Sequence, residues 1–158
     1  MNKQQAMAQE KAKRRHERTK NRKPTQRGLM NITATVQQCV ALAQSQALAN
    51  ANFTEPGMTI KIAQAMAAAQ TVAEPYGRQR RRILEEYGKV DENGTLMTQP
   101  DGSLVYKDPK KRQELEDRIQ AELDATTEIV VPEMTMDQVK WEGMTPAGVL
   151  PLLPFLKA

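Results

Sequence analysis

Residues 58–87 read MTIKIAQAMAAAQTVAEPYGRQRRRILEEY and carry the longest regular apolar pattern in the chain. One stripe recurs at the spacing of a helix face, at Ile62, Met66, Ala69 and Ala73. Pro75 follows, so the helix either ends there or kinks and continues. Further apolar residues keep the spacing beyond the proline, at Ile83, Leu84 and Tyr87. We therefore expect a continuous helix that begins near Met58 and ends at Tyr87, with Gly88 as its C-terminal cap.

A second helix is predicted on the N-terminal side of this one. Apolar residues at helical spacing, with two leucines nearby, indicate a helix over residues 33–50; they are Val36, Val40, Leu42, Ala43, Ala47 and Leu48. The connector over residues 50–57 is rich in turn formers. Two helices joined by so short a loop favour an antiparallel hairpin.

The C-terminal half alternates turns with short regular segments. Two turn sequences between residues 89 and 107 predict a small β-hairpin or an ordered loop. Asp108-Pro109 is typical of a helix start, and Leu115, Ile119 and Leu123 give the following helix one apolar face. Residues 128–131 form a strand candidate, and Thr145-Pro146 begins a short apolar segment that ends at Leu156. The predicted fold class is mainly α, with a helical hairpin, a third amphipathic helix and a small β-hairpin or short strands.

Charge divides the chain into two regions, an N-terminal arm (residues 1–28) and a body (residues 29–158). The arm has ten Lys or Arg residues and two acids, for a net charge of +8, whereas the body has a net charge of −4. The arm also lacks Leu, Ile, Val and aromatic residues, so we expect it to be disordered when free. The body has the pattern of one small domain. A basic arm on an acidic body is typical of a segment that binds polyanions.

From residue 30 onward the body resembles a family of small, uncharacterised proteins encoded by tailed phages. The matching features are a helical hairpin that ends in ILEEYG (83–88), the turn segment DENG (91–94), the helix containing QELE (113–116), the strand EIVV (128–131) and the ending TP…LPLLPFL (145–156). This resemblance is one of layout and covers most of the body. It favours a phage structural or assembly protein, and because the family has no assigned catalytic residues, none is transferred to this chain. The chain departs from the family in its basic arm, its Ala/Gln-rich first helix and Pro75.

The arm carries the predicted nucleic-acid contacts. Dense Lys and Arg residues neutralise phosphates and release counterions, which gives salt-sensitive binding. Residues 12–18 also resemble the arginine-rich RNA-binding peptide of lambdoid-phage antitermination proteins. The alternative is a solvated tail that touches an acidic protein surface. The predicted contacts are Lys11, Lys13, Arg14, Arg15, Arg18, Lys20, Arg22, Lys23 and Arg27.

A second basic cluster lies in the long helix, at Arg78, Arg80, Arg81 and Arg82. These side chains spread around much of the helix circumference. Glu85 lies four residues beyond Arg81 and three beyond Arg82, and Glu86 lies four beyond Arg82. This spacing favours local ion pairs over an anion-binding patch.

The residue inventory disfavours an enzyme. Cys39 is the only cysteine and His16 the only histidine, so we expect no zinc site, no intramolecular disulfide and no cofactor. We interpret Cys39 as a small buried apolar residue of the first helix. The acidic pairs lie on exposed helical stretches without the burial that would raise their pKa values for acid–base chemistry.

An apolar C-terminus is unusual, because chain ends commonly fray. This one either packs on the body or binds another subunit, and the single tryptophan before it is either a core residue or an interface contact. The residues predicted to bind a partner are Trp141, Leu150, Leu152, Leu153 and Phe155.

Two functions remain open on these grounds. The first is a phage structural or assembly protein that docks on other phage or host subunits and contacts DNA or RNA through the arm. The second is a phage RNA-binding regulator, antitermination-like or ribosome-associated. Neither a signal peptide nor a membrane span is apparent, so we expect the host cytoplasm or the virion as its location. The aromatic-poor core favours an oligomer or a larger assembly.

Overall fold

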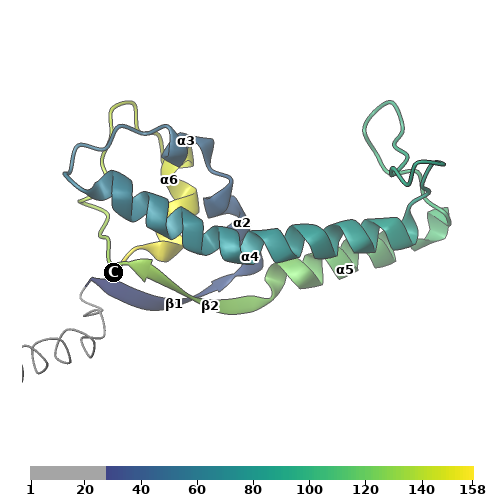
Figure 1. The fold of residues 1–158 in the computed structure, drawn as a ribbon, viewed down its shortest axis with the longest axis horizontal. Helices are drawn as coiled ribbons and strands as arrows, with labels where there is room; N and C mark the ends of the chain where they lie inside the picture. The colour runs from purple at the N-terminus through teal and green to yellow at the C-terminus, as the bar shows by residue number, and fades with distance from the viewer. Residues whose placement is uncertain (1–27) are drawn as a thin grey trace, which may run out of the picture.

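The computed structural model of the protein describes residues 28–158. Its elements in chain order are β1 (Leu29–Thr35), α2 (Val36–Ala43), α3 (Gln46–Ala49), α4 (Met58–Tyr87), the 3₁₀ helix η1 (Pro109–Lys111), α5 (Arg112–Asp124), β2 (Thr126–Pro132), α6 (Pro146–Val149) and the 3₁₀ helix η2 (Leu150–Phe155). The fold is mainly α-helical with a two-stranded antiparallel sheet, in agreement with the predicted class. In Figure 1, α4 extends across the body; α2, α3, α6 and the sheet surround its first part, and α5 lies along its second part.

The first element of the body is a strand, which corrects the helix expected over residues 33–50. β1 pairs antiparallel with β2 over its full length. Its Met30, Ile32 and Ala34 turn toward the core and alternate with exposed Asn31 and Thr33, which is the period of a strand. The predicted helix begins too early, at residue 33. The helical spacing starts only at Val36, and the residues before it alternate as in a strand.

Local capping explains why the first helix is short and interrupted. The Thr35 hydroxyl accepts the N–H of Gln38 (3.1 Å), and the Gln38 side chain accepts the N–H of Thr35 (2.9 Å). This reciprocal capping box begins α2 at Val36. After α2 ends, the Ser45 hydroxyl accepts the N–H of Leu48 and begins the separate helix α3.

The long helix α4 agrees with the prediction in both its bounds and its passage through Pro75. Pro75 is exposed, so water can hydrate the carbonyl that loses its donor. The buried face of the helix consists of Met58, Ile62, Ala65, Ala69, Ala73 and Ile83. Small alanines at the middle of this face allow the neighbouring elements to approach α4 closely.

Gly88 is the C-terminal cap of α4, as expected, but it lacks the left-handed conformation that glycine commonly adopts after a helix. Its φ is −91°, which other residues adopt readily. A Cβ at this position would lie 2.8 Å from Leu104 Cδ1 and 2.9 Å from Leu96 Cδ2. It would also lie 2.8 Å from the backbone carbonyl oxygen of Leu84, which cannot move aside as the ends of leucine side chains can, so a glycine fits this position best.

That segment, residues 88–107, is called the tip segment below because Figure 1 shows it at the far end of α4. Two turns close at Gly94 and Gly102, both with positive φ. Isolated antiparallel bridges join Gly88 to Tyr106, Val90 to Leu96, and Thr98 to Leu104. The expected small hairpin or ordered loop is thus present as two turns joined by short antiparallel bridges.

The C-terminal segment packs on α2, α3 and β1 and completes the main core. The Thr145 hydroxyl caps α6 by accepting the N–H of Gly148, and Pro146 occupies the first turn, both as expected. The main core combines buried residues of β1, α2, α3, α4, β2 and the C-terminal segment. Ile83 and Leu115 are also buried but lie outside that cluster, between the second part of α4 and α5.

Candidate interaction surfaces

The C-terminal residues predicted to bind a partner are divided between the core and the surface. A 3₁₀ helix has three residues per turn, so positions i and i+3 lie on one face. In η2, Leu152 and Phe155 share the inner face and are fully buried. Leu150 and Leu153 share an outer face and remain 59% and 44% exposed. The interface prediction is therefore wrong for Leu152 and Phe155, whose side chains anchor the chain end in the core.

Trp141 is half-buried and packs against the core. Its ring meets that of Phe53 edge to face, with centroids 5.5 Å apart and planes at 70°. The two residues also form an antiparallel bridge. Next to them, Thr54 donates both its N–H (2.9 Å) and its hydroxyl (2.8 Å) to the carbonyl of Lys140. Trp141 thereby joins the loop before α4 to the loop before α6.

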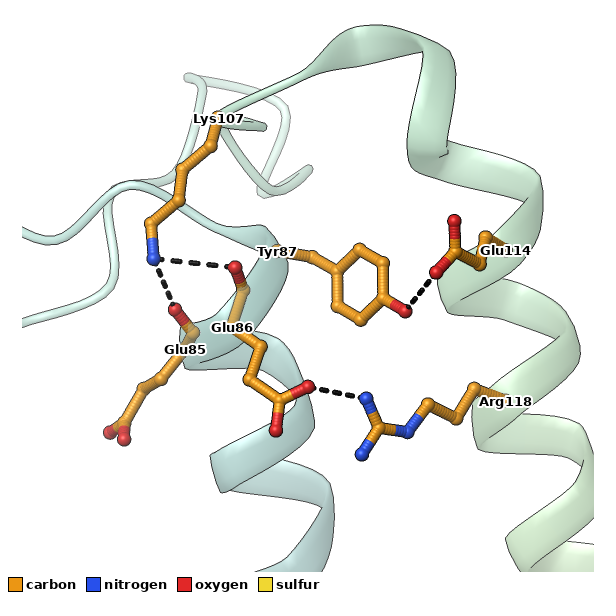
Figure 2. A network of polar contacts seen from close by, with 6 residues as sticks. All are labelled: Glu85, Glu86, Tyr87, Lys107, Glu114 and Arg118. Atoms are coloured by element: carbon orange, nitrogen blue, oxygen red, sulfur yellow. Dashed lines mark hydrogen bonds and ion pairs between the residues drawn. The ribbon is translucent and has the colours of Figure 1, made fainter.

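A network of polar contacts joins the end of α4 to the tip segment on one side and to α5 on the other. Lys107 Nζ donates to the carbonyls of Glu85 (2.7 Å) and Glu86 (3.3 Å). These carbonyls lie at the end of α4, where no further turn of the helix supplies an N–H donor. Tyr87 donates its hydroxyl to Glu114 on α5 (2.7 Å). Figure 2 shows these side chains converging from the two helices and from the strand-like chain at Lys107.

Arg118 of α5 completes this network by pairing with Glu86. The hydrogen bond that Arg118 donates to the Glu86 carboxylate raises the pKa of its guanidinium, with Tyr87 contributing in the same direction. A pocket of about 510 Å³ opens beside these groups; it is lined by Glu86, Tyr87, Lys107, Asp108, Lys111, Glu114 and Arg118. Its lining holds three cations and three carboxylates. Because these opposite charges are balanced, and Glu86 and Arg118 among them pair with one another, we interpret the pocket as a structural contact between α4, α5 and the tip segment and not as a ligand site.

The arginine cluster of α4 is only partly neutralised. Arg81 pairs with Glu85 (2.9 Å), as the spacing predicts. Glu86 pairs across to Arg118 instead of back to Arg82, because α5 runs antiparallel to α4 at this point. Within residues 28–158, Arg78, Arg80 and Arg82 form no ion pair. The expected local pairing thus accounts for one of the four arginines.

Other candidate chemistry has a structural explanation. Asp91 Oδ1 accepts the N–H groups of Asn93 and Thr95 (both 2.9 Å), so this carboxylate stabilises a turn. Cys39 is fully buried, and burial raises the pKa of its thiol. In the described part of the chain, no three His, Cys, Asp or Glu residues are grouped so that they could hold a metal ion.

The nine predicted nucleic-acid contacts, from Lys11 to Arg27, lie outside the described residues. Among residues 28–158, no helix combines the length and apolar character needed to cross a membrane. No protein-family model, curated protein or solved structure matches the chain. The fold and the contacts described above therefore define only a class of protein: a mainly helical body, extended by α4 and α5, that follows a basic N-terminal arm.

Proposed function

We propose that the protein is a non-enzymatic binding protein whose basic arm contacts nucleic acid while the body docks on other protein subunits. The observation that carries the proposal is the charge separation between the arm, at +8, and the body, at −4. Phosphates would attract the arm and weakly repel the body, so the arm would be the first part to engage a polyanion.

The proposed setting is a phage structural or assembly protein, as the layout of the body suggests. In such a particle the arm would reach packaged nucleic acid, and exposed apolar groups of the body would face neighbouring subunits. Leu150 and Leu153 are suitable contacts because their side chains form an exposed row on η2. The buried Leu152 and Phe155 behind them would hold that row in place.

The test is duplex-DNA binding by the full chain across a salt series. One variant neutralises the arm by Lys13→Gln, Arg14→Gln, Arg15→Gln and Arg18→Gln. A matched control removes the same charge from exposed positions of the body by Arg78→Gln, Arg80→Gln, Arg82→Gln and Lys110→Gln. We expect the arm variant to bind more weakly and to lose about 0.9 from the slope of log affinity against log salt for each phosphate contact removed.

The body control should retain most of the affinity and slope. Equal losses in the two variants would mean that net charge, and not the arm, determines binding. Unchanged binding in both would leave the arm as a contact for an acidic protein surface, and the proposal would fail.

The second candidate is an RNA-binding regulator, favoured by the arginine-rich sequence of residues 12–18. Arg side chains can contact phosphates in pairs and stack on unpaired bases. A structured RNA hairpin and duplex DNA of equal charge distinguish the two candidates. Strong preference for one hairpin over scrambled RNA supports a regulator, whereas equal binding together with fixed-stoichiometry recovery in particles supports an assembly protein.

A further inference from the structure

The direction of the backbone groups in β1 follows from the two hydrogen bonds that bracket its ladder with β2. Glu133 N–H donates to the Gly28 carbonyl (2.7 Å) at one end, and Val36 N–H donates to the Ala125 carbonyl (2.8 Å) at the other. Residues of an antiparallel strand point their backbone groups alternately toward and away from the partner. The even-numbered residues of β1 therefore direct their N–H and C=O groups toward β2.

The odd-numbered residues of β1 direct theirs to the opposite, free edge. At Thr35 the outward N–H is already used, since it donates to the Gln38 side chain. At Leu29, Asn31 and Thr33, neither the N–H nor the C=O has a hydrogen-bond partner within residues 28–158. The edge of β1 consequently presents three consecutive outward donor–acceptor pairs.

This edge lacks the devices that usually prevent strand pairing. Proteins guard free edges with charged residues, prolines or bulges. β1 has the sequence LMNITAT, without a charge or a proline, and its register with β2 is continuous. The other strand, β2, carries exposed Glu128 and ends at Pro132. Of the two strands, β1 is the one open to an additional partner.

The side chains along β1 also leave apolar surface uncovered at this edge. Met30 and Ile32 pack on the main core but are only half-buried, and Leu29 on the outer face is 43% exposed. A two-stranded sheet is marginal by itself and gains stability from further strands. A strand placed against β1 would cover Met30 and Ile32 while satisfying the outward backbone groups.

We propose that the occupant is β1 of a second copy of this chain, paired antiparallel about a two-fold axis at Asn31. Asn31 would then face its own copy, and Leu29 would face Thr33 of the other copy, so each odd-numbered residue exchanges two backbone hydrogen bonds. The Asn31 side chain is self-complementary because its amide both donates and accepts. The result is one four-stranded sheet with the order β2-β1-β1-β2.

The position of the arms selects the antiparallel arrangement of the two copies. Each arm joins the chain at the start of β1, so antiparallel strands separate the two +8 arms by about 14 Å along the sheet, whereas parallel strands would bring them together. The arm itself is a poor edge strand, because residues 1–28 have a net charge of +8 and contain no Val, Ile, Leu or aromatic residue.

The test is the oligomeric state of the nuclease-treated full chain, measured by sedimentation over a range of concentrations. Asn31→Lys and Asn31→Asp each place two like charges directly opposite one another. We expect each variant alone to weaken the dimer about fivefold and an equimolar mixture of the two to recover or exceed the original affinity. Asn52→Lys and Asn52→Asp, at an asparagine outside the sheet, should leave the dimer unchanged.

Four results would overturn the inference, three of them from sedimentation and one from hydrogen exchange. The three are a chain that stays monomeric at every concentration, a dimer insensitive to the Asn31 substitutions, and a mixture that fails to recover affinity. Slow hydrogen exchange of the Asn31 and Thr33 amides in a monomer would assign the edge to the chain's own arm and would also overturn it. None of these results depends on nucleic-acid binding, so this inference and the proposed function can fail separately.

Discussion

At the scale of single residues, steric space explains positions that sequence patterns describe only approximately. Gly88 follows a helix, where glycine commonly adopts a left-handed conformation. Its actual φ of −91° removes that reason, and the close approach of Leu96 and Leu104 replaces it. A Cβ at Gly77, within the helix, would meet no other segment of residues 28–158 within 4 Å. The two glycines of α4 and its cap thus serve different needs.

This difference predicts opposite effects of the same substitution. Gly88→Ala should lower the free energy of unfolding by about 1–3 kcal/mol, because the new methyl group meets two leucine side chains and the Leu84 carbonyl. Gly77→Ala should raise it by about 0.5–1 kcal/mol, because alanine favours the helix and has open space. Denaturant unfolding of both variants measures the two changes in the free energy of unfolding. Similar effects from the two substitutions would contradict the close approach at Gly88.

At the scale of elements, η2 illustrates how helical geometry divides one apolar run into two roles. The run reads LPLLPF, and its letters alone do not distinguish inward from outward leucines. The three-residue period of the 3₁₀ helix buries Leu152 and Phe155 and exposes Leu150 and Leu153. Only the outer pair remains available to a neighbouring subunit.

Adjacent leucines of η2 should therefore respond very differently to truncation. Leu152→Ala should cost about 2–5 kcal/mol of folding free energy, since it removes a fully buried side chain. Leu153→Ala should change stability by less than about 0.5 kcal/mol, because its side chain is substantially exposed. Thermal and denaturant unfolding provide the comparison. A large loss for Leu153→Ala would mean that this leucine is buried in an oligomer already present in solution.

At the scale of the whole molecule, burial differs between the two parts of α4. The main core surrounds its first part, whereas beside its second part the buried residues outside that core include Ile83 of α4 and Leu115 of α5. Exposed polar contacts hold Lys107 of the tip segment to α4 and hold α4 to α5, and such contacts contribute little individually. We expect the tip segment and the adjacent helix ends to open more readily than the core.

Hydrogen exchange of Ile83→Ala tests this division. The substitution should lower protection in the tip segment and in the adjoining ends of α4 and α5 by an amount equivalent to about 2–5 kcal/mol, while core amides of β2 change little. Ile62→Ala, in the main core, should instead lower protection throughout residues 28–158. Uniform loss of protection in both variants would mean that the body unfolds as one cooperative unit.

Local sequence signals predicted the features that depend on a few neighbouring residues. These include α4 with Pro75 inside it, the turns of the tip segment, and the helix starts at Asp108 and Thr145. Helical spacing, turn residues and caps act within a few positions, so one stretch of chain contains the whole signal. The charge separation between arm and body is likewise a property of the sequence.

Contacts between distant residues required the tertiary structure. β1 is a strand because it pairs with β2, about a hundred residues later, and no local pattern identifies that partner. Glu86 pairs with Arg118 of α5 and not with Arg82 of its own helix, because α5 lies beside this end of α4. Leu152 and Leu153 are neighbours with the same side chain, yet one is buried and the other exposed. Burial and pairing at these positions depend on which surfaces meet when the chain folds, and that is a property of the packed molecule.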